Sequence, residues 1–145
     1  MVIKFSKLSK RAIIPKYETL QSAGMDIRAC LDKPIILSSM ERVLVPTGLA
    51  VEVEQGYEVQ VRARSGLALK NGISLVNGIG TIDSDYRGEI GIILINLGTD
   101  NFTINDGDRI AQLVVAKYET PDITRQENLS QTSRQAGGFG STGTN

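Results

Sequence analysis

The sequence has no histidine and no tryptophan, and its single cysteine is Cys30. Without histidine, Ser–His and Cys–His nucleophilic catalysis and imidazole metal sites are excluded. A single cysteine excludes an internal disulfide and favours a reducing compartment, so we expect a cytoplasmic protein. Candidate chemistry must therefore come from carboxylates and arginines.

The sequence also lacks a long apolar run and a net charge. The longest apolar run, at Ile92–Ile95, has the length of a strand, and residues 1–10 have no apolar signal core. We therefore expect no membrane-spanning or secretory segment. The 16 basic and 16 acidic residues cancel, so no overall field favours nucleic acid or an anionic membrane.

Short alternating segments separated by turn residues predict about ten β-strands and almost no helix. We expect these strands at residues 2–8, 26–29, 34–37, 41–54 (divided at Pro46-Thr47-Gly48), 57–64, 73–76, 89–97, 102–104 and 109–118. The only helical segment is 65–71, which Ser65 could cap and Asn71-Gly72 could end. The pattern predicts an all-β sandwich or barrel.

The composition changes after Pro121. Residues 130–145 are rich in glycine, serine and threonine, and Phe139 is their one large apolar residue, so they cannot bury a core of their own. Glycine-rich backbone with hydroxyls could wrap a phosphate, whereas a frayed terminus is the ordinary alternative. We predict a barrel domain at 1–125 and a flexible arm at 126–145.

The most distinctive segment is 80–90, which is polar and lies between two apolar runs. Asp83 follows Ile82 at a predicted strand end, beside Gly78 and Gly80, and is a candidate general base. Tyr86 offers an amphipathic face for a sugar or a base. The alternative is a long hairpin in which the aspartates and glycines only shape the turn.

Three further clusters are ambiguous when each is taken alone. Arg64-Ser65-Gly66, at the predicted helix start, is either an anion site or a serine cap beside a solvated arginine. Asp26, which follows the flexible Gly24, indicates a surface aspartate by itself. Residues 107–109 indicate a turn followed by an internal Asp–Arg pair, Gln112 interrupts an apolar run, and Glu89 is expected to be a solvated charge.

Taken together and in this order, these segments closely resemble the five motifs of the trimeric dUTP pyrophosphatases (dUTPases). The matching segments are 23–29, 64–72, 77–90, 107–113 and 134–143. Gln135 departs from the family, which usually has glycine after the arginine. The resemblance implies a distorted, jelly-roll-like β-barrel that forms a homotrimer, with each active site assembled from three chains and a third-motif hairpin holding the nucleoside.

The resemblance also implies the reaction, which is Mg²⁺-assisted attack of water on the α-phosphorus of dUTP to give dUMP and pyrophosphate. Asp83 matches the general base, and Tyr86 matches the ring that packs on deoxyribose. Positions matching uracil contacts are the backbone of Thr81, Ile82 and Gly91 and the side chain of Asn77. Such an enzyme limits uracil in DNA and supplies dUMP for dTMP synthesis.

The remaining matches concern the phosphates, the metal and the arm. Arg64, Ser65, Gly66 and Gln112 match phosphate-binding positions. Asp26 matches an aspartate that supports Mg²⁺ through water, because magnesium dehydrates reluctantly. The positions that match the closing arm are Arg134, Phe139, Gly140, Ser141 and Thr142.

The sequence leaves two alternatives open. A dCTP deaminase shares the fold, but its second motif has Arg-Ser-Ser where this chain has Arg64-Ser65-Gly66. A binding or regulatory protein could keep the nucleotide pocket and act on a partner protein. The presence of Asp83, Tyr86 and the whole fifth motif favours catalysis over this second alternative.

Overall fold

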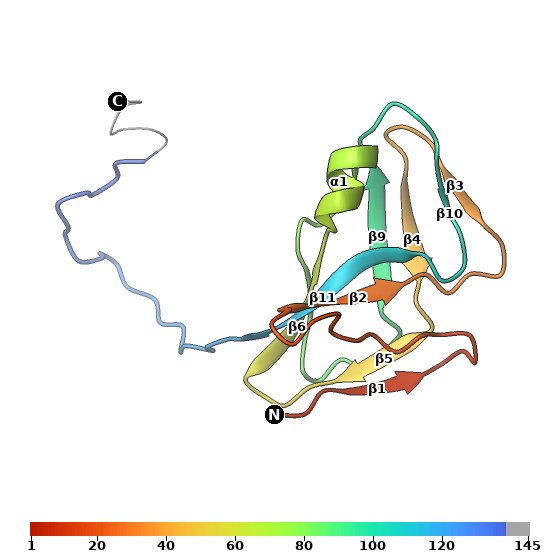
Figure 1. The fold of residues 1–145 in the computed structure, drawn as a ribbon. Helices are drawn as coiled ribbons and strands as arrows, with labels where there is room; N and C mark the ends of the chain where they lie inside the picture. Colours follow the sequence, from red (N-terminus) through yellow and green to blue (C-terminus); the bar gives the residue numbers. More distant parts are fainter. Residues whose placement is uncertain (139–145) are drawn as a thin grey trace.

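The computed structural model describes residues 1–138, which form eleven β-strands and one short helix (Figure 1). The strands are β1 (Lys4–Lys7), β2 (Gly24–Arg28), β3 (Ile35–Leu37), β4 (Arg42–Pro46), β5 (Leu49–Glu52), β6 (Tyr57–Arg62), β7 (Ile73–Leu75), β8 (Gly80–Ile82), β9 (Gly91–Asn96), β10 (Phe102–Ile104) and β11 (Arg109–Lys117). The helix is α1 (Ser65–Asn71). This composition confirms the predicted all-β class.

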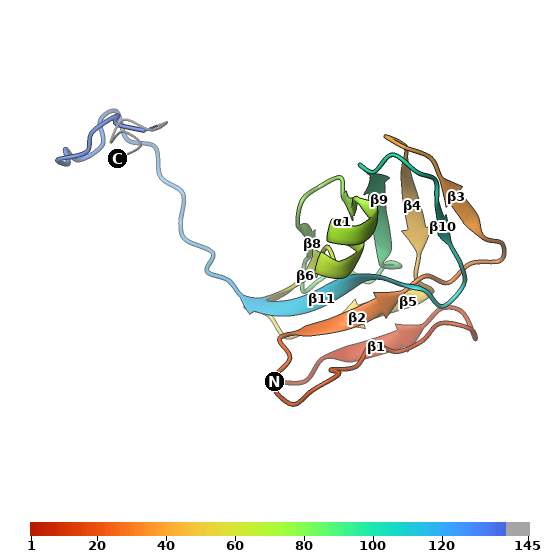
Figure 2. The same cartoon turned by 45° about the horizontal axis from the view of Figure 1, so that its top comes forward.

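The strands form four antiparallel groups that enclose one core (Figures 1 and 2). The largest sheet has the order β2-β11-β6-β8, the next has the order β4-β9-β7, and β1-β5 and β10-β3 are two-stranded. Alternation along β6 buries Val59 and Val61, as the sequence predicted. The core is aliphatic, and residues such as Leu37, Ile92 and Leu113 are fully buried.

The segment between β8 and β9 connects two sheets. β8 pairs with β6, whereas β9 pairs with β4 and β7. The hairpin expected at residues 80–90 is therefore wrong, because its flanking strands do not pair with each other. Ile82 and Ile92 are both buried, so each strand has an apolar face that predicts a strand but does not specify its partner.

The helix has the predicted bounds but not the predicted cap. Its N-cap residue is Arg64, in extended conformation, and no side chain caps the first turn. Ser65 lies within the helix, so its predicted capping role is wrong. The predicted end is confirmed, because Gly72 adopts a left-handed φ of 69° and its N–H bonds to the carbonyl of Ala68.

Beyond β11, the chain leaves the barrel (Figures 1 and 2). Residues 119–136 are all exposed, and the hydrogen bonds of residues 119–138 join only residues of that same segment. This part of the chain has no core of its own, in keeping with its composition. Within residues 1–138, none of the helices has the length and apolar character that a membrane crossing requires.

Candidate active site

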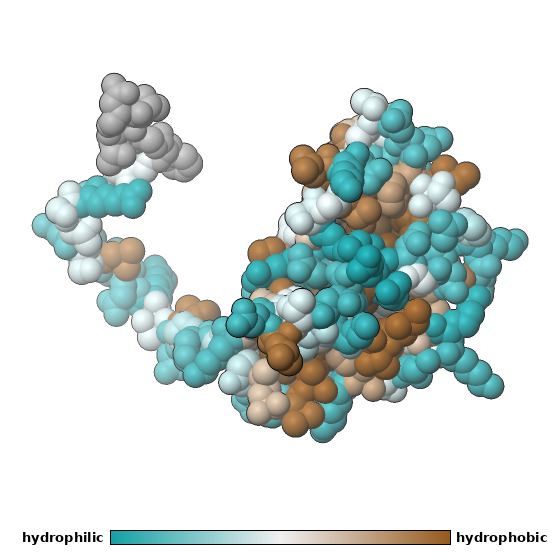
Figure 3. All heavy atoms as spheres, viewed as in Figure 1, coloured by the Kyte–Doolittle hydropathy of each residue, from teal (hydrophilic) through white to brown (hydrophobic). Residues whose placement is uncertain are grey.

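An arginine-rich surface lies on the outward face of the sheet formed by β2, β11 and β6. In the strand register, Gln112 lies opposite Asp26 on one side and Arg62 on the other, so these three side chains share a face. Arg28 lies on the same face, two residues after Asp26, and Arg64 follows β6. Figure 3 shows hydrophilic residues gathered over β11 and β2 in this view.

Asp26 joins two of these arginines. Its Oδ1 accepts a hydrogen bond from Nε of Arg64 at 3.2 Å, and its Oδ2 accepts one from Nη1 of Arg109 at 3.1 Å. The side chains of Asp26 and Arg64 are only 20% and 25% exposed. Neither Asp26 nor Arg64 is therefore the fully solvated side chain that the alternative interpretations of these two clusters described. A charged group that is partly removed from water needs a partner of opposite charge. Here Asp26 and Arg64 are partners of each other.

Arg109 is a residue that the sequence interpretation missed. The expected internal pair with Asp108 does not form, because Oδ2 of Asp108 accepts hydrogen bonds from the backbone and side chain of Asn105. Arg109 instead contacts Asp26, and its carbonyl accepts a hydrogen bond from Nη1 of Arg64 at 2.9 Å. These two contacts join residues that are 83 and 45 positions apart in the sequence, so no local pattern indicates them.

Gln112 and Gly24 fit together on this face. The side-chain amide of Gln112 donates to the carbonyl of Ala63 at 3.0 Å, which links β11 to the segment before Arg64. A Cβ atom at Gly24 would lie 2.4 Å from Oε1 of Gln112. Gly24 is therefore needed for space rather than for a positive φ. Ser65 and Gly66 are exposed in the first turn of α1, close in sequence to Arg64.

A second region is a cavity of about 210 Å³ beside the β8–β9 segment. It is lined by Thr81, Ile82, Asp83, Tyr86, Glu89, Ile90 and Gly91. Five of these seven were predicted site residues. The sixth prediction in this region, Asn77, is exposed in the turn before β8 and is not among the lining residues.

The wall of this cavity is held by hydrogen bonds to backbone groups. The N–H of Tyr86 bonds to the carbonyl of Asp83 at 3.1 Å, and its hydroxyl donates to the carbonyl of Glu89 at 3.0 Å. A Cβ atom at Gly88 would lie 2.3 Å from that hydroxyl. Glu89 is exposed, but it is more than a solvated charge, because its carboxylate accepts a hydrogen bond from the N–H of Gly48 at 2.7 Å.

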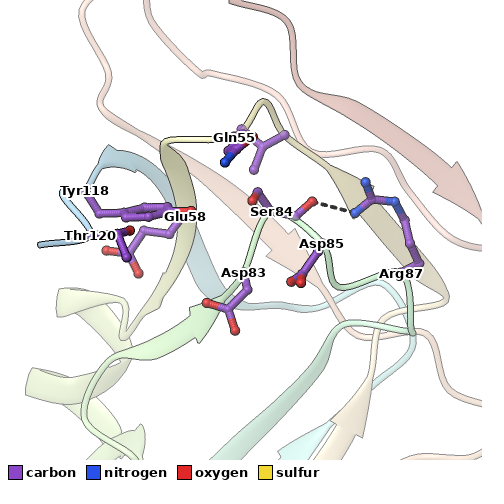
Figure 4. Close-up of a pocket in the computed structure, with 9 residues that line it drawn as sticks. Gln55, Glu58, Asp83, Ser84, Asp85, Arg87, Tyr118 and Thr120 are labelled. Carbon is purple, nitrogen blue, oxygen red and sulfur yellow. Dashed lines mark hydrogen bonds between the residues drawn. The ribbon is translucent and has the colours of Figure 1, made fainter. Parts of the chain in front are cut away.

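Asp83 also lines a larger cavity of about 710 Å³. Figure 4 shows the carboxylates of Glu58, Asp83 and Asp85 around this cavity, with Arg87 hydrogen-bonded to the carbonyl of Ser84. The Asp83 side chain is exposed. No group within residues 1–138 donates a hydrogen bond to its carboxylate. Its oxygens are therefore free to accept from water.

The arm carries the last group of predicted residues. Arg134 donates through Nε to the carbonyl of Gly137 at 2.7 Å and does not line either cavity. Gln135, which replaces the glycine usual in the resembling family, has a φ of 46°. That is the left-handed region that glycine enters at the least cost. Phe139, Gly140, Ser141 and Thr142 lie outside the described residues.

A protein-family model named dUTPase matches residues 10–143. The chain belongs to the dUTPase family. A deoxyuridine 5'-triphosphate nucleotidohydrolase of Treponema denticola is 55% identical over 139 residues, which are 96% of each chain. A protein of the same name from Brucella melitensis biotype 2 is 59% identical over 133 residues, covering 90% of this chain and 85% of that protein.

The solved structures agree with the fold. The G164S mutant of the Staphylococcus bacteriophage 80alpha dUTPase, solved with dUpNHpp, superimposes with a TM-score of 0.85 at 27% identity and covers 98% of both chains. The jelly-roll-like dUTPase fold is thus confirmed. The chain is an enzyme of the dUTP diphosphatase class, and dUTP hydrolysis is its supported activity. Membership of the dUTPase family favours hydrolysis of dUTP over the two alternatives, which are deamination of dCTP and a purely regulatory role.

Asp26 is the residue that the sequence predicted to support a metal ion. Within the described part of the chain, no three His, Cys, Asp or Glu side chains lie close enough to hold a metal ion. Both oxygens of Asp26 already accept hydrogen bonds from arginines. Since Mg²⁺ prefers substrate phosphates plus water to a dedicated set of protein ligands, these side chains fit a magnesium ion that enters together with a phosphate ligand.

Proposed function

We propose that this dUTPase hydrolyses dUTP to dUMP and pyrophosphate through attack of water on the α-phosphorus, with Asp83 as the general base. The observation that carries this proposal is the position of Asp83. Its exposed carboxylate lies on the boundary between the 210 Å³ cavity and the larger one, and it is free of other donors. A general base needs access to both water and substrate.

In this proposal, the smaller cavity binds the deoxyuridine. Backbone groups of Thr81, Ile82 and Gly91 and the side chain of Asn77 read the uracil, and the ring of Tyr86 packs on deoxyribose. Fixed backbone donors and acceptors discriminate strongly, because a mismatched base leaves buried polar groups unpaired. The partly exposed side chain of Tyr86 and its hydrogen-bonded hydroxyl support this role.

The arginine-rich face receives the triphosphate. Arg64, Ser65, Gly66 and Gln112 contact the phosphates, and Asp26 supports Mg²⁺ through water. Magnesium, when bound, neutralises negative charge on the phosphates, and positioned cations stabilise the charge that develops on the leaving pyrophosphate. Arg134, Phe139, Gly140, Ser141 and Thr142 of the arm 126–145 close over the bound nucleotide.

The two regions are far apart within one chain, which supports a shared site. The β6–β8 register pairs Val59 with Ile82, so Glu58 lies beside Asp83, and both line the larger cavity. Arg64 lies six residues further along the extended chain, about 20 Å away at the rise of a β-strand. One nucleotide therefore needs Asp83 from one copy and Arg64 from another, as in a homotrimer.

An apolar surface supports the same assembly. On the outward face of the β4-β9-β7 sheet, Leu44 and Ile93 lie opposite each other and are 64% and 37% exposed. Val76, whose N–H bonds to the carbonyl of Ile93, is exposed beside them. Contiguous exposed apolar groups mark surfaces that another chain covers.

In the cell, we propose a cytoplasmic enzyme that limits uracil in DNA and supplies dUMP for dTMP synthesis.

The test compares the wild-type chain with Asp83→Asn on dUTP, dCTP, UTP and dTTP in magnesium, by measuring pyrophosphate release. We expect release from dUTP alone and a loss of about 10²–10⁴-fold in kcat for the variant. Binding of the dUTP analogue dUpNHpp is expected to persist in the variant. Full turnover in Asp83→Asn contradicts the assignment of the base, and release from dCTP or UTP contradicts the proposed specificity.

A further inference from the structure

The start of β11 contains a β-bulge that changes which face Arg109 occupies. Ala111 pairs with Ile27, but the next pair along β2 joins Arg28 to Arg109, so Ile110 is an extra residue. Ile110 and Ala111 are consecutive and both buried, at 2% and 0% exposure. In a regular strand, alternation from Gln112 would turn Arg109 inward. The bulge turns it outward, to the face of Asp26, as bulges beside functional sites do.

On that face, Arg109 holds Arg64 at two points. Its carbonyl accepts a hydrogen bond directly from Nη1 of Arg64 at 2.9 Å. Its guanidinium bonds to one oxygen of Asp26 at 3.1 Å, and the other oxygen of Asp26 accepts from Nε of Arg64 at 3.2 Å. Arg64 is thereby fixed from two sides by groups that Arg109 supplies or orients.

We propose that Arg109 is a positioning residue for dUTP hydrolysis, which acts by fixing the guanidinium of Arg64 through Asp26. The inference rests on the proposed function, in which Arg64 contacts the triphosphate. A guanidinium has five N–H donors, and two of those of Arg64 are engaged within residues 1–138. Three donors remain for phosphate oxygens, on a side chain whose orientation is already set.

The charge balance explains why a second arginine is needed. Without Arg109, the Asp26 carboxylate would neutralise Arg64 alone, and the pair would present no net charge to a triphosphate. With Arg109, the cluster of one carboxylate and two guanidiniums carries a net charge of +1. Preorganised positive charge of this kind is stabilising because it needs no rearrangement when the ligand binds.

The test measures Kd for dUpNHpp and for deoxyuridine, together with kcat and KM for dUTP, in wild type, Arg109→Ala and Arg109→Lys. We expect Arg109→Ala to weaken dUpNHpp binding by about 10- to 100-fold, since charged hydrogen bonds are lost. Deoxyuridine binding should change by less than about twofold, because the nucleoside cavity is not contacted. Arg109→Lys should recover part of the loss by restoring the cation.

A double-mutant cycle decides whether Arg109 acts through Arg64. In the Arg64→Ala background, Arg109→Ala is expected to cause little further loss, because coupled residues are not additive. If the losses of the two single variants add in full, the inference is overturned, because Arg109 would then act on the ligand independently of Arg64. Arg11→Ala is the control, because Arg11 pairs with Asp32 at an exposed position outside both regions. If Arg109→Ala fails to fold, Arg109→Gln carries the same expectation in the same cycle.

The outcomes separate this inference from the function on which it rests. A wild-type chain that binds neither dUpNHpp nor deoxyuridine overturns the proposed function and this inference with it. Wild-type binding that is unchanged in Arg109→Ala overturns the inference alone. A loss of deoxyuridine binding equal to the loss of dUpNHpp binding also overturns it, because a general structural defect, rather than positioning of Arg64, then explains the effect.

Discussion

The two regions of the candidate site are built by different means. The arginine-rich face is a network of charged side chains, in which Asp26 joins Arg64 and Arg109 across residues distant in sequence. The cavity proposed to bind the nucleoside is instead held by hydrogen bonds to backbone groups, in which the Tyr86 hydroxyl donates to the carbonyl of Glu89 and the Glu89 carboxylate accepts from the N–H of Gly48. Charge suits a flexible polyphosphate, whereas fixed backbone groups suit a flat base whose edges must be distinguished.

Both regions depend on a glycine whose missing side chain makes room for a site residue. Gly88 leaves space for the hydroxyl of Tyr86, and Gly24 leaves space for the carboxamide of Gln112. Neither glycine has a positive φ, so space rather than backbone freedom explains both. A single added methyl group should therefore damage one region and spare the other.

Of the two glycine substitutions, the larger effect is expected from Gly88→Ala. The new Cβ would lie 2.3 Å from the Tyr86 hydroxyl and 2.5 Å from its ring carbon Cζ, so the ring must leave its position. The ring of Tyr86 is proposed to pack on deoxyribose, where it would also leave no room for a ribose 2′-hydroxyl, so the preference for dUTP over UTP in kcat/KM should fall by at least about tenfold. Parallel assays with the two nucleotides measure this ratio.

Tyr86→Phe is the matched control for Gly88→Ala. It removes the hydrogen bond to Glu89 but keeps the ring, so its effect on the preference should be clearly smaller. An unchanged preference in Gly88→Ala, with the ring displaced in its crystal structure, would show that Tyr86 does not determine sugar specificity.

A smaller effect is expected from Gly24→Ala. The added Cβ would lie 2.4 Å from Oε1 of Gln112, and that flexible side chain can move away, which spares the fold but breaks its bond to Ala63. KM for dUTP should rise about three- to tenfold, the loss of about one hydrogen bond. Deoxyuridine binding, measured by calorimetry, should stay unchanged.

Gln112→Ala tests the cause of that effect. If Gly24 acts only by making room for Gln112, then Gly24→Ala should add little in the Gln112→Ala background. Additive losses would mean that Gly24 has another role, such as a close backbone approach to the ligand.

The sequence predicted most of the strands because their signals are local. Alternation along residues 57–62 and 102–104 and the apolar run at 92–95 depend on near neighbours only, and all three appear as strands. Pairing is a different matter, because it depends on contacts between distant segments. The interpretation of residues 80–90 as a hairpin failed for this reason, since β8 and β9 belong to different sheets.

The candidate site shows the same limit. Motif resemblance indicated Thr81, Ile82, Asp83, Tyr86 and Gly91, and these five line one cavity. The partners of Asp26 were not predictable, because a bulge decides the face of Arg109 and neither local pattern nor motif order reveals a bulge of this kind. The sequence interpretation paired Asp108 with its neighbour Arg109, and this prediction is wrong.

The smallest effect is expected at an exposed ion pair that involves the β8–β9 segment, which lines the smaller cavity. Arg87, in that segment, lies 3.9 Å from the carboxylate of Glu52. The hydrogen bond and charge of Lys4, with a smaller contribution from Arg87, hold the pKa of Glu52 below its ordinary value of 4.5. A depressed carboxyl pKa stabilises the fold above the ordinary value, and this contribution is lost as the pH falls through the folded pKa.

This exposed pair sharpens the contrast with the partly buried Asp26 cluster. In Lys4→Ala, the pKa of Glu52 should rise toward its ordinary value, as a carboxyl-carbon NMR titration below pH 6 would measure. Because the carboxylate of Glu52 is exposed and its charge is screened by solvent, the stability of the fold at pH 7 and kcat for dUTP should hardly change. A marked loss of turnover in Lys4→Ala would contradict the view that hydrogen bonds to backbone groups, rather than ion pairs, hold the smaller cavity in shape.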